Sequence, residues 1–337
     1  MGAFAALATV TRNDIAESTH LGDLVVCDTA GRIVFSLGDP ERLAYYRSSG
    51  KPLQALSVVQ SGAADQFAFT DTELAVCCAS HHGSRMHVLT VQGILEKLGL
   101  DETDLLCGVH EPGDPAERNR LIKAGEAPGP LHNNCSGKHA GMLATARALG
   151  APVAGYLALD HPVQQHIAAS LALATGLPAE ELHFAPDGCG APVLAAPLHA
   201  IAVSYARLAN PRDMPAGFAA AARRIVQAMA AAPQMISGPG AFNTELLDAA
   251  NGHLVAKGGA EGLYAVGIAD PRGLGLAVKI ADGSARALPP VVVKALRQLG
   301  ALSAAQLEAL QSHAAPAVTN CHGTVVGAIE SVVELTL

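Results

Sequence analysis

Strand patterns stand at both ends of this sequence, and helical patterns occupy its middle. Near the start, the apolar segments 24–28 and 32–36 flank the turn-rich link Thr29-Ala30-Gly31, which predicts a β-hairpin. Further strands are expected at 263–269, 275–280 and 325–335. Because both ends supply strands and the middle supplies helices, we expect an α+β fold, with one antiparallel sheet built from both termini and covered by helices.

Helical spacing of apolar residues marks the middle of the chain. One helix is expected to start just after Ser48-Ser49-Gly50-Lys51, because Pro52 favours a first helical turn and apolar residues then recur at helical spacing. Other helices are expected at 86–98, 139–149, 163–175, 217–231 and near 290–299. No repeat, low-complexity tract or linker divides the chain, so residues 1–337 are expected to form a single domain.

The composition excludes several classes of protein. Half of the 337 residues are hydrophobic and only 15% are charged, which excludes a disordered chain. The net charge is −8, from 22 Lys and Arg against 30 Asp and Glu, and no basic block is present, so nucleic acid is not an expected partner. Seven cysteines are an odd number in a long chain, which argues against a disulfide framework.

The sequence lacks the patterns of membrane and secreted proteins. Two stretches of membrane-spanning length carry no charged residue, 188–206 and 225–244, but Pro and Gly interrupt both, so no membrane helix is expected. The first ten residues are apolar but lack the basic segment of a signal peptide. We therefore expect a cytoplasmic protein.

The first candidate for chemistry is the pair Ser48 and Lys51 at the predicted helix start. The S-x-x-K spacing is one helical turn, so the lysine amine can reach the serine hydroxyl. A neutral lysine acts as a base if burial and a neighbouring cation lower its pKa from about 10.4 toward neutrality. The same spacing also fits a helix N-cap followed by a surface lysine, so the pair needs further partners to indicate catalysis.

Ser80 and Lys257 could be these partners. Penicillin-recognising serine enzymes combine S-x-x-K with a second serine on a loop and a K-T-G on a strand. Here Lys257-Gly258-Gly259 precedes a predicted strand but lacks the hydroxyl, and Ser80 is followed by two histidines rather than by Asp-Asn. The alternative for Lys257 is a surface lysine before a glycine turn.

A third cluster centres on two cysteines. It comprises the segment 132–139, HNNCSGKH, and the segment 187–190, DGCG. Two cysteines, a histidine and an aspartate could bind zinc, although the C-x-x-C and C-x-x-H spacings are missing. Two buried apolar cysteines are one alternative, and a nucleophilic Cys135 with His139 nearby is another.

Taken together, the candidate segments around Ser48, Ser80, Cys135, Cys189 and Lys257 make the sequence resemble a known family. This family is the rhizobial-type, or class 3, L-asparaginases of the asparaginase II family. The matching blocks run in family order across about residues 20–335. They are Arg47-Ser48-Ser49-Gly50-Lys51-Pro52, Cys78-Ala79-Ser80-His81, Asn134-Cys135-Ser136-Gly137-Lys138-His139-Ala140-Gly141-Met142-Leu143, Asp187-Gly188-Cys189, and Ala256-Lys257-Gly258 before Tyr264-Ala265-Val266-Gly267. The block N-C-S-G-K-H-x-G-M-L is long and specific.

The resemblance implies a fold similar to serine β-lactamases and glutaminases, a homodimer, and hydrolysis of L-asparagine to L-aspartate and ammonia. It implies two catalytic Ser–Lys pairs, Ser48 with Lys51 and Ser80 with Lys257. Arg47 would lie beside the nucleophile and bind substrate. The whole chain would then be one catalytic domain of this family.

The resemblance also implies a zinc ion near the site that orients substrate. Its ligands would be Cys135, Lys138 and Cys189, with water in the fourth position, and the substrate-binding residues His139 and Asp187 would lie beside the metal. Lysine is an unexpected zinc ligand because its amine must be neutral, and general rules alone favour His139.

Two positions depart from the family pattern. Asn243 stands where some relatives have a cysteine, and Lys257 is followed by Gly258-Gly259 rather than by Leu-Gly. Both positions are expected near the site, so the affinity for substrate is expected to differ from that of the family.

The expected mechanism is a two-step acyl transfer. Ser48, deprotonated by neutral Lys51, attacks the side-chain amide of asparagine, and water then hydrolyses the acyl-enzyme. Ser80 and Lys257 relay a proton to the departing ammonia. The sequence leaves open which serine attacks. It also leaves open a β-lactamase-like or peptidase-like acyltransferase and a zinc-stabilised protein that binds an amino acid.

Overall fold

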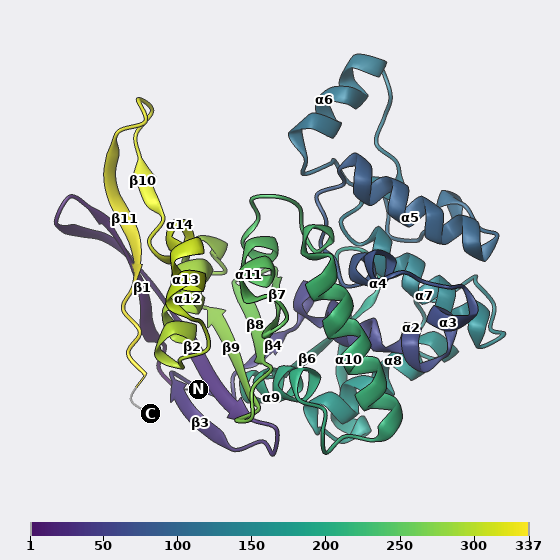
Figure 1. Ribbon diagram of the computed structural model, residues 1–337, viewed down its shortest axis with the longest axis horizontal. Coiled ribbons are helices and arrows are strands. Elements are labelled where there is room, and N and C mark those ends of the chain that lie inside the picture. Colours follow the sequence, from purple (N-terminus) through teal and green to yellow (C-terminus); the bar gives the residue numbers. More distant parts are fainter. Residues whose placement is uncertain (1, 336–337) are drawn as a thin grey trace. The chain divides into compact units, whose positions relative to one another are not determined.

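The structure, a computed structural model, describes residues 2–335, which form two compact units (Figure 1). As far as they are described, unit 1 is made of Met1–Ser49, Ala195–Asn210 and Glu245–Leu337. Unit 2 is made of Gly50–Leu194 and Pro211–Thr244. The chain therefore starts in unit 1, enters unit 2 at Gly50, returns to unit 1 for Ala195–Asn210, enters unit 2 again at Pro211 and finishes in unit 1.

Unit 1 contains the sheet that the sequence predicts. Its strands run in the order β10-β11-β1-β2-β9-β8-β7, with β3 paired to β2, and all neighbours are antiparallel. The bounds are β1 Ala5–Arg12, β2 Ile15–Asp28, β3 Ile33–Leu37, β7 Leu254–Gly259, β8 Leu263–Ile268, β9 Leu274–Ile280, β10 Ala317–Thr319 and β11 Val325–Ser331. Strands from the start of the chain pair with strands from its end, which confirms the predicted α+β class.

Helices pack on this sheet. The helix α9, Leu198–Ala209, contacts β2, β8 and β9, and α12, Leu288–Gln298, contacts β11 and β9. The remaining elements of unit 1 are β4 Leu43–Tyr45, η6 Ala285–Ala287, α13 Ala304–Ala309 and α14 Gln311–Ala314. Three elements cross the boundary between the units: η1 Arg47–Gly50, β6 Pro192–Pro197 and α11 Phe242–Ala250.

Two strand glycines allow α9 to approach the sheet closely. A Cβ atom on Gly275 would lie 1.9 Å from the carbonyl oxygen of Ala202, and one on Gly267 would lie 2.1 Å from that of Tyr205. Any larger residue would force the helix away from the sheet. The glycines thus fix the position of α9, whose Tyr205 anchors the segment that carries Ser48.

Unit 2 is predominantly helical. Its elements are α1 Lys51–Gln54, α2 Leu56–Gln60, α3 Ala63–Gln66, α4 Asp71–Cys77, α5 Arg85–Leu98, η2 Glu102–Asp104, α6 Pro115–Ala124, η3 Pro130–His132, α7 Ser136–Ala148, α8 Pro162–Thr175, η4 Ala179–Glu181, β5 His183–Pro186, α10 Ala216–Ala231 and η5 Pro233–Met235. The helix α7 contacts α2, α3, α4, α5 and α8, so it lies at the centre of the unit (Figure 1).

Two glycines on one face of α7 explain part of the long sequence block. A Cβ on Gly137 would lie 2.2 Å from the carbonyl oxygen of Val76, and one on Gly141 would lie 3.0 Å from the sulfur of Cys77. The two positions are four residues apart and therefore share a helical face. This close packing on α4 fixes Lys138 and His139, which lie between the two glycines in the chain.

Five expected helices, α5, α7, α8, α10 and α12, are confirmed with ends that differ by at most three residues, whereas the helix expected from Pro52 is divided into α1 and α2. The strand expected at 24–28 begins at Ile15, and the helix α4, which the sequence analysis did not predict, ends at Cys77. Thr70 and Glu73 form a capping box that starts α4. Lys257 lies inside the strand β7 rather than before a strand.

Candidate functional site

Arg47 and Ser48 lie on the short 3-10 helix η1, where the chain leaves unit 1. Arg47 has a φ of 46°, in the left-handed region that costs a non-glycine residue energy and that clusters at functional sites. Its guanidinium lies 3.9 Å from the carboxylate of Glu261. The half-buried hydroxyl of Ser48 has no hydrogen-bond partner among residues 2–335. Ser48 thus lies on a strained segment, and its hydroxyl makes no hydrogen bond within the described chain.

Two tyrosines of unit 1 hold this segment in place. The hydroxyl of Tyr205 donates to the carbonyl oxygen of Ser49 at 2.6 Å. The hydroxyl of Tyr46 lies 2.8 Å from that of Ser204, and both tyrosines are fully buried. Because Ser204 and Tyr205 belong to α9, the strained backbone is anchored on a helix that itself packs on the sheet.

The strand β7 brings Lys257 toward the same segment. Lys257 is 1% exposed, and its Nζ donates to the carbonyl oxygen of Gly258 at 2.8 Å. A Cβ on Gly259 would lie 2.6 Å from the carbonyl oxygen of Tyr46 and 3.3 Å from the backbone nitrogen of Ser49. Gly259 therefore permits the end of β7 to lie against the backbone around Ser48. The departure from Leu-Gly lies at the preceding residue, Gly258.

In unit 2, the amine of Lys51 lies beside the hydroxyl of Ser80. Lys51 is 1% exposed, and its Nζ is 3.0 Å from Ser80 Oγ. The same nitrogen donates to the carbonyl oxygens of Ala79 at 2.6 Å and of Asn134 at 3.2 Å. Burial lowers the pKa of Lys51, and the nearby charge of Lys138 lowers it further, although the thiol of Cys135 opposes the shift. Lys51 therefore has the environment that a lysine base needs.

Backbone pairing explains how Ser80 comes to this place. After α4 ends, the N–H groups of Ser80 and His82 donate to the carbonyl oxygens of Ile236 and Ser237 at 2.9 and 2.8 Å. The chain around Ser80 is thus held in extended form against a segment that is about 155 residues away in the sequence. Asn243 supports that segment, because its side-chain nitrogen donates to Ser237 Oγ at 3.0 Å.

Cys135, Lys138 and Cys189 meet in the interior of unit 2. Cys135 is the N-cap of α7, and Lys138 lies in its first turn. Cys189 lies on a tight turn after β5, closed by a hydrogen bond from the nitrogen of Asp187 to the oxygen of Ala191. Lys138 Nζ donates to the sulfur of Cys189 at 3.0 Å. All three side chains are at least 94% buried.

The charges of this cluster are tightly linked. Burial opposes the charged form of Lys138, but the two cysteines and then Asp187 outweigh burial and raise its pKa. The hydrogen bond from Cys189 holds the pKa of Cys135 well below its usual range, against the effect of burial and with help from Lys51 and Lys138. The cluster thus favours a thiolate on Cys135 and an ammonium group on Lys138.

The donor set of this cluster fits a zinc ion. Two sulfurs and one nitrogen converge, a number of protein ligands that leaves one position open. With Zn–S distances of about 2.3 Å and Zn–N distances of about 2.0 Å, one ion could contact both Cys189 Sγ and Lys138 Nζ, which lie 3.0 Å apart. Within residues 2–335, no group of three or more His, Cys, Asp or Glu side chains could hold a metal. A metal here would therefore need Lys138 as its third ligand.

His139 follows Lys138 on α7 and is fully buried. Its Nδ1 lies 2.6 Å from the hydroxyl of Tyr156, whereas its Nε2 has no hydrogen-bond partner among the described residues. Burial lowers the pKa of His139 well below its usual range, and the charges of Lys138 and Lys51 add to this effect. The imidazole is therefore neutral at physiological pH.

The predicted site residues thus divide between the two units. Unit 2 brings together Lys51, Ser80, Cys135, Lys138, His139, Asp187 and Cys189, and unit 1 holds Arg47, Ser48 and Lys257. The sequence analysis missed Tyr156 and the carbonyl groups of Ala79 and Asn134. Backbone carbonyls carry no side-chain signal, and Tyr156 lies outside every block that we compared, so neither could be identified from the sequence.

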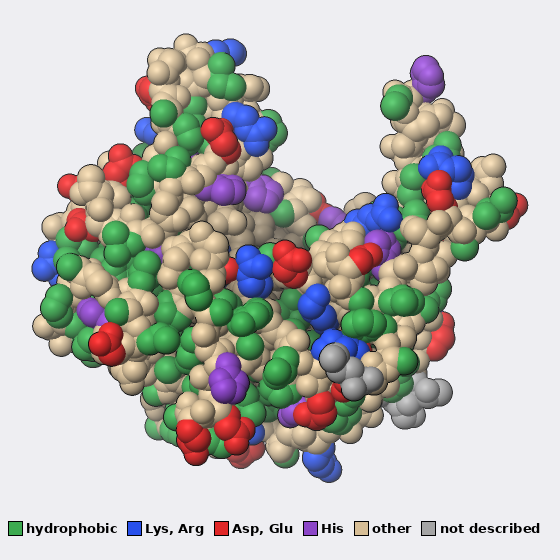
Figure 2. Space-filling model, turned by 180° about the vertical axis from the view of Figure 1, so that it is seen from behind, with side chains coloured by type: hydrophobic (Ala, Val, Ile, Leu, Met, Phe, Trp, Pro, Cys, Tyr) green, Lys and Arg blue, Asp and Glu red, His purple; other side chains and the backbone are tan. Residues whose placement is uncertain are grey.

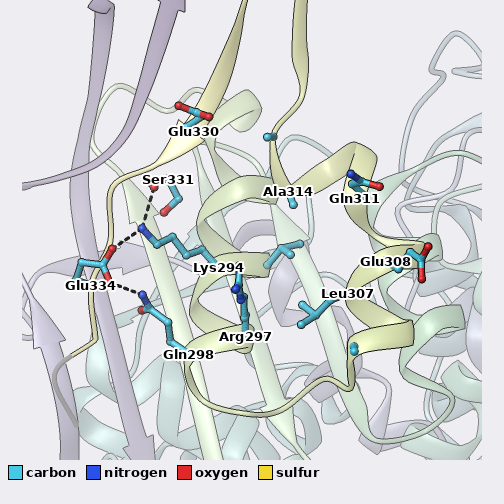
Figure 3. Close-up of a pocket in the computed structure, with 13 residues that line it drawn as sticks. Lys294, Arg297, Gln298, Leu307, Glu308, Gln311, Ala314, Glu330, Ser331 and Glu334 are labelled. Carbon is cyan, nitrogen blue, oxygen red and sulfur yellow. Dashed lines mark hydrogen bonds and ion pairs between the residues drawn. The ribbon is translucent and has the colours of Figure 1, made fainter.

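A groove of about 1020 Å³ lies elsewhere in unit 1, between α12, α14 and β11 (Figure 3). Lys294 donates there to Glu334 at 2.7 Å and to the carbonyl oxygen of Ser331, and Gln298 also donates to Glu334. Its lining includes none of the site residues above. The groove holds neither of the serines nor any of the cysteines singled out by the sequence, so we do not assign the chemistry to it.

Acidic and basic side chains are interspersed over the face that Figure 2 presents. Within residues 2–335, no helix combines the length and apolar character that crossing a membrane requires.

Known proteins resemble this chain to different degrees. The family described as L-asparaginase II matches residues 8–331. No curated protein matches. Among solved structures, a beta-lactamase from Mycobacterium bovis is 14% identical, with 82% of this chain and 94% of that chain covered and a TM-score of 0.43. A putative beta-lactamase from Bacteroides dorei DSM 17855 is 15% identical, with coverage of 82% and 93% and a TM-score of 0.42. A structure of Mglu is 16% identical, with coverage of 83% and 67% and a TM-score of 0.36.

Proposed function

Because this chain belongs to the L-asparaginase II family, whose members are amidohydrolases, we propose that it hydrolyses L-asparagine to L-aspartate and ammonia. The observation that carries the proposal is the buried amine of Lys51 at 3.0 Å from Ser80 Oγ. A serine within hydrogen-bond reach of a lysine of lowered pKa is the arrangement that acyl transfer by Ser–Lys chemistry needs. The homodimer and the cytoplasmic location expected from the sequence belong to the same proposal.

The surroundings of Lys51 suit a neutral amine. A neutral amine has two N–H groups and one lone pair, and the carbonyl oxygens of Ala79 and Asn134 can only accept. With both N–H groups donated to these carbonyls, the lone pair is left to accept a proton from a serine hydroxyl. Lys51 is therefore the proposed general base.

The proposed reaction has two steps. Ser48, three residues before Lys51 in the chain, gives its proton to the lysine, and its oxygen bonds to the amide carbon of asparagine. As the carbon–nitrogen bond breaks, the proton passes from Lys51 through the Ser80 hydroxyl to the leaving nitrogen, so that ammonia departs neutral. Water, deprotonated by the same lysine, then cleaves the ester to aspartate and restores Ser48. In this scheme Lys257 supports the proton transfer at Ser80, and Arg47 and Asp187 bind the charged groups of the substrate.

Zinc is part of the proposal. Cys135, Lys138 and Cys189 would hold the ion, and when bound it supplies a fixed positive charge that orients the substrate. Lys138 would then be a neutral ligand, since a metal replaces the proton on its amine. The serine and lysine already provide a nucleophile and a base, so an activated metal-bound water is not needed for the attack.

Removal of zinc is expected to raise KM more than it lowers kcat. Cys135→Ala, Lys138→Ala and Cys189→Ala should each lose the ion and raise KM about tenfold, because uniform binding of the substrate is lost while the acyl-transfer groups stay. His139→Ala should keep the ion and weaken asparagine binding. Elemental analysis beside steady-state kinetics measures both effects.

Cys27→Ala is the matched control for these variants, because Cys27 is equally buried but lies on β2, in unit 1. It should retain zinc and the normal KM. A zinc-free wild type with a normal KM would remove the metal from the proposal. A collapse of kcat at unchanged KM would place the ion in the chemical step instead.

Asparagine is expected to be preferred over glutamine by about a hundredfold in kcat/KM. A site that fixes the α-amino and α-carboxylate groups would misplace the amide carbon of glutamine by about an ångström, which costs roughly that factor. A coupled ammonia assay on asparagine, glutamine and buffer alone tests this, with a chromogenic β-lactam as a substrate of another class. Equal kcat/KM for the two amides, or turnover of the β-lactam alone, would refute asparagine as the substrate.

A further inference from the structure

The imidazole of His139 and the phenol of Tyr156 form a fully buried pair in unit 2. The two rings meet edge to face, with centroids 5.6 Å apart and an interplanar angle of 80°. His139 Nδ1 lies 2.6 Å from the Tyr156 hydroxyl, and that hydroxyl also accepts a hydrogen bond from the backbone nitrogen of Leu106 at 2.9 Å. Both side chains are buried, so any hydrogen-bond partner of their polar atoms must come from the protein or from a bound ligand.

Counting protons assigns the tautomer of His139. The Tyr156 oxygen accepts from Leu106, and its one proton has a single nearby acceptor, His139 Nδ1. If Nδ1 carried the histidine proton instead, the tyrosine proton would lose its acceptor, and Nε2 would be a second unsatisfied buried atom. The neutral imidazole therefore carries its proton on Nε2.

The assigned tautomer leaves one buried donor unused. Nε2 has no partner in the described chain, and a buried donor without an acceptor costs about 1–3 kcal/mol. A buried N–H donor that the protein leaves unsatisfied suits an anionic oxygen brought by a ligand.

We propose that Tyr156 is a positioning residue that holds His139 as an Nε2–H donor for the carboxylate of the substrate. This inference rests on the proposed function, in which His139 binds asparagine. Tyr156 touches no substrate in this scheme and acts only by fixing the proton and the ring plane of His139.

The backbone of Tyr156 is held as firmly as its hydroxyl. Its carbonyl oxygen accepts from the side-chain nitrogen of Gln164 at 2.8 Å. The next residue, Leu157, lies against the turn that carries Cys189, because a Cβ on Gly190 would be 3.4 Å from Leu157 Cδ1. The segment that orients His139 therefore also supports the Cys189 turn.

The tautomer can be measured on the resting protein. In protein with ¹⁵N-labelled histidine, long-range ¹H–¹⁵N correlation spectra should show one neutral imidazole with protonated Nε2 and bare Nδ1, absent from the spectrum of His139→Gln. In Tyr156→Phe the same ring should become a mixture of tautomers. A wild-type His139 with its proton on Nδ1 would overturn the proposal, whether or not the protein turns over asparagine.

A double-mutant cycle then separates positioning from packing. Tyr156→Phe should raise KM for asparagine about tenfold with a much smaller change in kcat. In the His139→Gln background the same substitution should raise KM less than twofold, because no imidazole is left to orient. Equal effects of Tyr156→Phe in both backgrounds would reduce Tyr156 to a packing residue and overturn the proposal. If no amide is hydrolysed, the proposed function fails, and the tautomer measurement still decides the role of Tyr156.

Discussion

Lys51→Arg is expected to lose about 10⁴-fold in kcat on asparagine while the protein stays folded. The guanidinium remains protonated at any pH that proteins tolerate, so it cannot accept the serine proton. Loss of a general base costs about 10²–10⁴-fold, and loss of one member of a tightly coupled catalytic unit can cost more. Steady-state kinetics and thermal unfolding, measured on the same preparations, test the expectation.

Two further variants make this test specific. Lys51→Met keeps the length of the side chain but removes the amine, and it leaves the carbonyl oxygens of Ala79 and Asn134 without their donor. It should therefore be inactive and also less stable, by about 1–3 kcal/mol for each unsatisfied carbonyl. Lys123→Arg is the control, because Lys123 is exposed on α6. Lys51→Arg with most of its activity left would show that Lys51 is not the base.

Local sequence signals predicted much of the fold. Periodic apolar residues located the helices α5, α7, α8, α10 and α12, and left-handed glycines, Gly99 and Gly176, end α5 and α8. The sequence analysis missed strands whose residues are uncommon in strands. The strand β7 holds a buried lysine and ends in two glycines, residues that are depleted in strands, and β1 is rich in alanine. Tertiary pairing overrides these weak preferences in both cases.

The site shows the same division between local and long-range information. The S-x-x-K spacing identified Ser48 and Lys51, and the Cys135 block identified a candidate metal cluster whose donors the structure does bring together. The contact of Lys51 with Ser80 joins residues that are 29 positions apart. It depends on the backbone pairing of Ser80 with Ile236, which no local pattern encodes.

Several assignments rest on the resemblance to the family and stay predictions. They are the pairing of Ser48 with Lys51, the pairing of Ser80 with Lys257, and the single domain over residues 1–337. The zinc ion stays a prediction as well, because convergence of suitable donors shows that an ion fits and does not show that one binds. Among these, the roles of the two serines can be separated most directly.

Ser48→Ala is expected to abolish turnover and the covalent intermediate, whereas Ser80→Ala is expected to slow turnover but keep the intermediate. The hydroxyl of Ser48 makes no hydrogen bond within the described chain, and the backbone of the preceding residue, Arg47, is strained. Tyr205 of α9 holds this segment in place. A fixed, strained segment suits a nucleophile, because its oxygen must meet the carbonyl carbon in one geometry. Loss of the nucleophile should cost about 10⁵–10⁶-fold in kcat, as for members of a coupled catalytic unit.

Ser80 differs because its hydroxyl lies beside the amine of Lys51, where it can carry a proton between the base and the leaving nitrogen. Loss of a proton carrier should cost about 10²–10⁴-fold, less than loss of the nucleophile, since water can partly replace a hydroxyl. Rapid acid quench during turnover of asparagine, followed by peptide mass mapping, should find the aspartyl adduct on the peptide that contains Ser48, in the wild type and in Ser80→Ala alike. Ser61→Ala, at the end of α2, is the control and should match the wild type. An adduct on the peptide that contains Ser80 would exchange the two roles: Ser80 would be the nucleophile, activated directly by the lysine it already contacts, and Ser48 would carry the proton.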